Sequence, residues 1–206
     1  MTLHRVEHPL IEDVLADLRD VRTEPSQFRR LAKRITTLIA FDASRDLPQR
    51  AERIATPLEE AEVARIDADI VLVPVLRAGM GMLDVLLELF PRATVGYVGL
   101  ERDESTAVAH QYYRKLPPLA ARHVFLLDPM LATGGSASAA ALLLREQGAR
   151  HVRLLCVVAA PEGIAHLERE CPEVDIYAAA VDRSLNERKF ILPGLGDFGD
   201  RLYGTV

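Results

Sequence analysis

The stretch Val124-Phe-Leu-Leu-Asp-Pro-Met-Leu-Ala-Thr-Gly-Gly-Ser136 decides the fold. An apolar run ends at a carboxylate, a short loop with two adjacent glycines follows, and an alanine- and leucine-rich stretch continues to Gly148. This order predicts a buried strand over 124–127, a tight turn and a helix. Glycine lets the backbone approach a ligand closely, and the first turn of a helix offers unpaired N–H groups. The stretch therefore predicts a site for a phosphate monoester, with Asp128 facing a sugar hydroxyl.

The alternative is an ordinary turn between a strand and a helix, in which Ser136 caps the helix and the glycines only make the turn tight. Thr133 and Ser136 also provide hydroxyl donors, and Pro129 biases Asp128 toward an extended backbone. The stretch has neither a Walker lysine nor a Gly-x-Gly-x-x-Gly pattern. It therefore disfavours a nucleoside triphosphatase and a dinucleotide-binding fold.

Short apolar runs alternate with helical patterns on both sides of this stretch. Buried strands are expected over four more segments: 70–75, 93–100, 152–158 and 174–180. Helices are expected after the first of these strands, after Gly135 and from Pro161. Apolar strands separated by helices predict an α/β fold with a parallel sheet covered on both faces. Ligands of such sheets bind at the carboxyl ends of the strands.

The first third of the sequence is expected to be helical. Pro9 and Pro25 each suit a first helical position. Four apolar residues are expected to share one face of the first helix: Leu10, Val14, Leu15 and Leu18. The second has an apolar stripe from Phe28 to Ile39. Residues 42–68 are polar without a clear period, and the same holds for residues 101–116.

The composition is that of one globular domain over residues 1–206, with a net charge of −5. The acidic balance argues against a nucleic-acid partner, and no apolar run is long enough to cross a membrane. Charges near the N-terminus argue against a signal peptide. Cys156 and Cys171 have no disulfide or metal spacing, which predicts a cytoplasmic protein, and the six histidines predict no metal site.

Three segments together resemble the uracil phosphoribosyltransferases, a branch of the type I phosphoribosyltransferases. Asp128–Ser136 resembles their loop for phosphoribosyl pyrophosphate (PRPP), in which a proline replaces the second acidic residue of the wider family. Val73–Met82 resembles their pyrophosphate loop. Ile191–Asp197, with Gly199-Asp200-Arg201 after it, resembles their uracil-binding hood. The resemblance extends from His8 to Thr205.

The resemblance implies a pentosyltransferase of pyrimidine salvage that converts uracil and PRPP to UMP and pyrophosphate. It implies these PRPP contacts: Arg77, Arg102, Asp128, Pro129, Met130, Leu131, Ala132, Thr133, Gly134, Gly135, Ser136 and Asp197. It implies these uracil contacts: Ile191, Gly196, Asp197 and Phe198. Asp128 and Arg102 are the implied catalytic residues. Mg²⁺ arrives with PRPP, GTP is an activator in some members, and the family forms homodimers or higher homo-oligomers.

The resemblance also implies a flap over residues 101–116 and a hood over residues 182–206. Several residues depart from the common pattern of the family, among them Val108-Ala109-His110, which replaces a more usual Glu-Pro-Val in the flap. Glu101 replaces a frequent tyrosine in the flap, Phe190 replaces a frequent tyrosine in the hood, and Phe198 replaces a frequent alanine. We expect uracil binding to persist, with a changed pocket volume and altered tolerance of 5-substituted uracils.

Two rival interpretations remain. A non-catalytic regulator that binds UMP or PRPP predicts a damaged pyrophosphate site or a basic face, whereas Arg77, Arg102 and Asp128 are all present. A phosphoribosyltransferase for another base is disfavoured by the hood motif, but the departure at Phe198 keeps it open.

Overall fold

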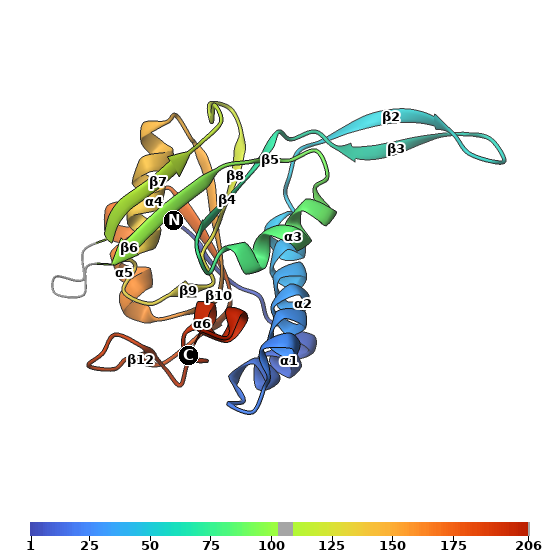
Figure 1. The fold of residues 1–206 in the computed structure, drawn as a ribbon. Coiled ribbons are helices and arrows are strands. Elements are labelled where there is room, and N and C mark those ends of the chain that lie inside the picture. Colours follow the sequence, from blue (N-terminus) through green and yellow to red (C-terminus); the bar gives the residue numbers. More distant parts are fainter. Residues whose placement is uncertain (103–108, 206) are drawn as a thin grey trace.

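The protein is described by a computed structural model that covers residues 1–102 and 109–205, without the side chains of 101, 102 and 109–111 (Figure 1). The helices are α1 Pro9–Arg19, α2 Pro25–Ala43, α3 Met80–Leu89, α4 Gly135–Glu146, α5 Pro161–Glu170 and α6 Phe198–Tyr203. The strands are β1 Leu3–Arg5, β2 Gln49–Ala55, β3 Glu60–Ile66, β4 Ile70–Leu76, β5 Thr94–Val95, β6 Tyr97–Arg102, β7 Ala109–Lys115, β8 His123–Leu127, β9 Met130–Leu131, β10 His151–Ala159, β11 Val174–Val181, β12 Ser184–Leu185 and β13 Ile191–Leu192.

The main sheet has the strand order β1-β11-β10-β8-β4-β6-β7. All neighbours in this order run parallel except β6 and β7, which pair antiparallel as a hairpin at one edge. The expected parallel sheet is thus confirmed. β8 lies at its centre, between β10 and β4, so the residues that follow β8 emerge at the middle of the carboxyl edge.

Helices cover both faces of the sheet, as expected, and alternate residues of each strand point to opposite sides (Figure 1). Leu72 and Phe125 belong to the core shared with α1, α2, α3 and α6. Val71 and Val124, one residue earlier on each strand, belong to the core shared with α4 and α5. Strands that are buried on both faces explain the apolar runs of the sequence.

The N-terminal helices begin at Pro9 and Pro25 as expected. One residue of the expected apolar face is wrong, because Leu10 is exposed and Ile11 is buried instead. Ile11, Val14, Leu15 and Leu18 follow the spacing i, i+3, i+4, i+7, which places them on one stripe of the helix. Leu10 lies just outside that stripe.

Two stretches without a clear period contain strands. Within residues 42–68, β2 and β3 form an antiparallel hairpin that projects from the body of the protein and is called the arm below (Figure 1). Within residues 101–116, β7 continues the sheet beyond β6. The central part of the implied flap, residues 103–108, lies outside the described residues.

No helix in the described ranges is long and apolar enough to cross a membrane.

Candidate active site

The implied substrate contacts come from segments that meet at the carboxyl edge of the sheet. Arg77 follows β4, Asp128 follows the neighbouring parallel strand β8, and the segment that carries the implied uracil contacts begins after β11. Arg102 is the last residue of β6, and β6 pairs with the edge of β4 that faces away from β8. Because parallel strands end at the same edge, four separate parts of the sequence converge there.

Residues 128–136, called the phosphate loop below, lead from β8 into α4. The N-cap of α4 is Gly134, in a left-handed conformation with φ of 81°, and no side chain caps the helix. The alternative in which Ser136 is the cap is therefore wrong. The first N–H groups of this helix face the carboxyl edge of the sheet and carry the positive end of the helix dipole, so they suit an anion.

Helix α5 supports the phosphate loop from behind. A Cβ atom on Gly134 would lie 2.8 Å from the carbonyl oxygen of Gly163, so only glycine fits between the loop and this helix. The Ser138 hydroxyl lies 3.1 Å from the Gly135 carbonyl oxygen and 3.1 Å from Nε2 of His166. These supporting residues were not expected from the sequence, because nothing in the local pattern shows that α5 packs behind the loop.

Gly135 differs from Gly134 in having free space beside it. A Cβ atom built on Gly135 would find only the Thr133 hydroxyl nearby, at 3.7 Å. The protein therefore does not itself require glycine at this position for packing. A ligand at the loop would supply a reason for it.

Asp128 is half-buried at the end of β8. Burial raises the pKa of its carboxyl group from 3.8 to about 7, and a hydrogen bond from the backbone N–H of Met130 opposes that shift. Burial acts in this direction because the charged form loses hydration. The group is aligned by the loop itself and can exchange a proton near neutral pH.

Arg77 lies in the arginine loop, residues 77–79, between β4 and α3. Its side chain is 63% exposed, and its Nη2 lies 3.5 Å from a carboxylate oxygen of Asp200. A Cβ atom on Gly79 would lie 2.2 Å from the carbonyl oxygen of Leu127, so the loop is pressed against the backbone of β8. The peptide bond between Leu76 and Arg77 is cis.

The hood, residues 182–206, begins as the short antiparallel pair β12 and β13 and continues through a glycine turn into α6. Gly194 and Gly196 adopt positive φ values of 63° and 83°. Asp197 caps α6 by accepting a hydrogen bond of 2.9 Å from the backbone N–H of Asp200. The glycine turn thus has a defined shape.

The implied uracil contacts differ in exposure. Gly196 and Asp197 are exposed, whereas Ile191 and Phe198 are buried. The Phe198 ring packs against Phe28 of α2, with ring centroids 5.1 Å apart. Its side chain therefore fills the core between α6 and α2, and its backbone is the part left for a ligand.

The hood contacts the arginine loop directly. The Tyr203 hydroxyl donates a hydrogen bond of 3.4 Å to the carbonyl oxygen of Arg77. A Cβ atom on Gly199 would lie 3.8 Å from that of Ala78. These contacts join the hood to the carboxyl edge of the sheet, next to the phosphate loop.

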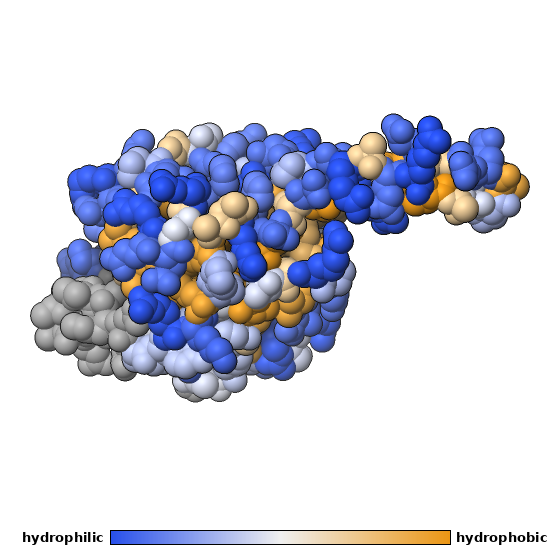
Figure 2. All heavy atoms as spheres, turned by 90° about the horizontal axis from the view of Figure 1, so that it is seen from above, coloured by the Kyte–Doolittle hydropathy of each residue, from blue (hydrophilic) through white to orange (hydrophobic). Residues whose placement is uncertain are grey.

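A separate cavity of about 460 Å³ lies at the opposite end of the strands, at the base of the arm. Its lining includes Arg50, Ile66, Phe90, Arg122 and His123. Figure 2, viewed from above, shows this end of the molecule, where apolar residues lie among hydrophilic ones. The cavity shares no residue with the converging loops.

A parallel sheet with a phosphate loop, an arginine loop and a hood at its carboxyl edge has the architecture of a type I phosphoribosyltransferase. The sequence matches the family model described as uracil phosphoribosyltransferase over residues 5–205. It is 48% identical over 205 residues to the uracil phosphoribosyltransferase of Shouchella clausii, with 98% of each chain covered. It is 47% identical over 207 residues to that of Thermus thermophilus, with 100% of each chain covered.

A solved structure shows the same fold. The AQ2163 protein from Aquifex aeolicus superimposes with a TM-score of 0.93 at 35% sequence identity, with 98% of each chain covered. The chain belongs to the uracil phosphoribosyltransferase family.

Proposed function

We propose that this protein transfers the phosphoribosyl group of PRPP to uracil, giving UMP and pyrophosphate in pyrimidine salvage. The observation that carries the proposal is the meeting of the phosphate loop, the arginine loop and the hood at one edge of the sheet. Each suits one part of the reacting pair: the 5′-phosphate, the pyrophosphate and the base. Membership of the family adds the substrate class.

In the proposed reaction the bond between ribose C1 and the pyrophosphate oxygen breaks and a bond from C1 to uracil N1 forms. The electron pair of the broken bond leaves with pyrophosphate, and the proton of N1 passes to solvent. The transition state has oxocarbenium character, so the protein needs to hold the reactants in line and to stabilise the leaving group. A covalent nucleophile is unnecessary.

The phosphate loop would bind the 5′-phosphate through the N–H groups at the start of α4. Asp128 would accept a hydrogen bond from a ribose hydroxyl. Arg77 would bind pyrophosphate, and Arg102 would reach it when the flap closes. The backbone of Ile191 and of residues 196–198 would read the edge of uracil, which presents two carbonyl acceptors and one N–H donor. Asp197 would also lie near PRPP.

Magnesium is proposed to enter with PRPP. Within the described residues, no group of three or more His, Cys, Asp or Glu side chains could hold a metal ion. When bound to PRPP, Mg²⁺ reduces the negative charge of the leaving pyrophosphate. The protein's part is to orient the pyrophosphate through its arginines.

The test is an assay with PRPP, Mg²⁺ and each of four free bases. Uracil should be consumed, whereas cytosine, hypoxanthine and adenine should not. An amino group in place of a carbonyl would leave a buried partner unpaired, and sites of this kind discriminate by about 10⁴-fold. Turnover of cytosine at the rate of uracil would contradict this account of the hood. Binding of UMP without turnover would instead favour a regulator.

We also propose that the protein forms a homodimer or a higher homo-oligomer. The arm projects as an isolated two-stranded hairpin, and Leu58 at its tip is 95% exposed (Figure 1). A hairpin of this kind is marginally stable in water by itself, so packing against a second copy would stabilise it. Sedimentation of the protein and of Leu58→Asp would measure this, with a lower mass expected for the variant.

Two further properties are proposed from the resemblance. GTP would stimulate the reaction, which initial rates with and without GTP would test. The protein would reside in the cytoplasm, which is consistent with free and buried thiols at Cys156 and Cys171.

A further inference from the structure

A buried ion pair lies beside the glycine turn of the hood. The two Nη atoms of Arg19 donate hydrogen bonds of 2.8 and 2.7 Å to the two carboxylate oxygens of Asp182. The Asp182 side chain is 6% exposed and that of Arg19 25% exposed. Arg19 ends α1, and Asp182 follows β11 at the carboxyl edge of the sheet. A two-pronged pair of this kind fixes the orientation of both groups.

Both partners of the pair also bind the backbone of Gly194. The Gly194 N–H donates a hydrogen bond of 2.8 Å to Asp182, and its carbonyl oxygen accepts one of 2.7 Å from Arg19. The turn around Gly194 is tight, because a Cβ atom there would lie 2.2 Å from the carbonyl oxygen of Ile191. The pair thus holds both polar groups of one residue, between Ile191 and Gly196, which are proposed to contact uracil.

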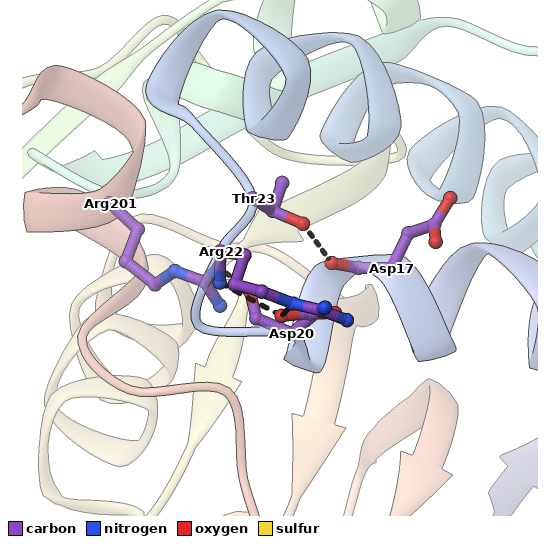
Figure 3. Close-up of polar contacts among 5 residues, drawn as sticks. All are labelled: Asp17, Asp20, Arg22, Thr23 and Arg201. Carbon is purple, nitrogen blue, oxygen red and sulfur yellow. Dashed lines mark hydrogen bonds and ion pairs between the residues drawn. The ribbon is translucent and has the colours of Figure 1, made fainter.

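A second arginine holds the next residue of the turn. Arg201 donates a hydrogen bond of 2.9 Å to the carbonyl oxygen of Leu195 and further bonds to those of Leu18 and Asp20, at the end of α1. Figure 3 shows Arg201 directed at this helix end, beside Asp20 and Arg22. The guanidinium also lies over the Phe28 ring, 4.6 Å from its centroid. A cation suits the negative end of a helix.

We propose that the Arg19–Asp182 ion pair positions the base-binding edge of the hood, so that Arg19 and Asp182 are positioning residues that set the affinity for uracil. The inference rests on the proposed function, because it takes the hood as the uracil site. A buried ion pair is weak evidence of a contribution to stability, since desolvation offsets much of the attraction. Here the surplus hydrogen bonds of both partners go to Gly194, and this is the observation that favours positioning.

The test compares variants of this pair with a matched pair elsewhere. Arg153 binds both carboxylate oxygens of Asp46 at 2.7 and 3.0 Å, and it also donates to the carbonyl oxygen of Ala43. The Arg153 side chain is 11% exposed, and it projects from β10. Arg153→Met therefore removes an arginine with the same two-pronged carboxylate pairing and a similar backbone contact, away from the hood, although its partner Asp46 is 67% exposed.

Arg19→Met and Asp182→Asn should each raise the KM for uracil by about 10-fold or more, the usual effect of losing a hydrogen bond to a charged group. The Kd of PRPP, measured by calorimetry, should change by less than about 2-fold, because only Asp197 of the proposed PRPP contacts lies in the hood. Arg153→Met should lower the Tm and leave both constants unchanged. Arg19→Lys, which can reach one partner but not both, should recover part of the uracil affinity.

Equal changes in both constants, or a fall in Tm alone as in Arg153→Met, would show that the Arg19–Asp182 pair only stabilises the fold. If Arg19→Met fails to fold, the isosteric Asp182→Asn decides the question. Failure of the proposed function is distinguishable, because the wild-type protein would then not turn over uracil at all.

Discussion

The guanidinium of Arg77 and the carboxylate of Asp200 lie 3.5 Å apart and connect the arginine loop to α6. The two side chains are 63% and 35% exposed, so water screens the pair and its contribution to stability is small. Pyrophosphate carries more negative charge than one carboxylate. The Asp200 carboxylate therefore holds Arg77 at the edge of the site, and a polyanion can replace this carboxylate as the partner of Arg77.

Arg77→Ala should weaken PRPP binding by roughly 30- to 150-fold, the loss expected for one charged hydrogen-bonding contact. The Tm should fall by no more than about 2 °C, because the pair that it loses is exposed. Calorimetric titration with PRPP and thermal unfolding measure the two effects. Arg92→Ala, at the opposite end of the sheet, is the control and should leave PRPP affinity unchanged. A similar loss in both variants would assign Arg77 only a general electrostatic effect.

Arg102→Ala should lower kcat and change PRPP affinity less. Arg102 lies at the end of β6, next to the implied flap, and a contact made only on closure acts mainly in the transition state. Steady-state kinetics beside direct PRPP titration separate the two effects. An unchanged kcat would mean that the flap does not close on the reacting groups, and Glu101→Tyr would then be the next variant to measure.

Gly135→Val should abolish measurable PRPP binding and leave the protein folded. The structure has room for the added side chain, since the nearest neighbour of a Cβ atom is 3.7 Å away, so the obstruction should fall on the ligand. Calorimetry and circular dichroism measure the two outcomes.

Gly134→Val provides the contrast. It should lose stability, because its φ is positive and its Cβ atom would lie 2.8 Å from the carbonyl oxygen of Gly163. Unchanged PRPP affinity in folded Gly135→Val would rule out this loop as the phosphate site.

Asp128→Asn should stabilise the ligand-free protein and reduce activity. The folded pKa of about 7 lies above the ordinary value of 3.8, so the folded state holds the proton more tightly. The free energy of unfolding therefore falls as pH rises from about 4 to about 7. The variant should gain up to about 4 kcal/mol at pH 8 and close to none at pH 4. Urea unfolding at both pH values measures this. An equal gain in the free energy of unfolding at both would contradict the explanation that burial raises the pKa of Asp128.

The central strands of the sheet were predictable because they are buried on both faces, whereas the edge strands β1 and β7 were not predicted. The run 70–75 has no polar residue, and the run 174–180 has a single charged one, Asp175. Pro9 and Pro25 mark the starts of α1 and α2, because proline fixes φ. The meeting of the loops at one edge of the sheet was predictable, because parallel strands share a carboxyl edge. The phosphate loop was predictable in the same way, since its glycines follow a buried strand.

The arm and the supports of the site were not predictable in this way. β2 and β3 contain no fully buried residue, and polar and apolar residues do not alternate along the whole of either strand. The packing of Phe198 on Phe28 and the pairing of Arg19 with Asp182 join residues more than 160 positions apart. Such contacts depend on the path of the chain in space, which local spacing does not contain.

Gly79 has a mechanical consequence. A Cβ atom on Gly79 would lie 2.2 Å from the carbonyl oxygen of Leu127, so no side chain fits between the arginine loop and β8 at this point. Arg77 and Asp128 are thus attached to two backbone segments in direct contact. A change that displaces one of these segments should displace the other, which would couple the proposed contact with pyrophosphate to the proposed contact with ribose.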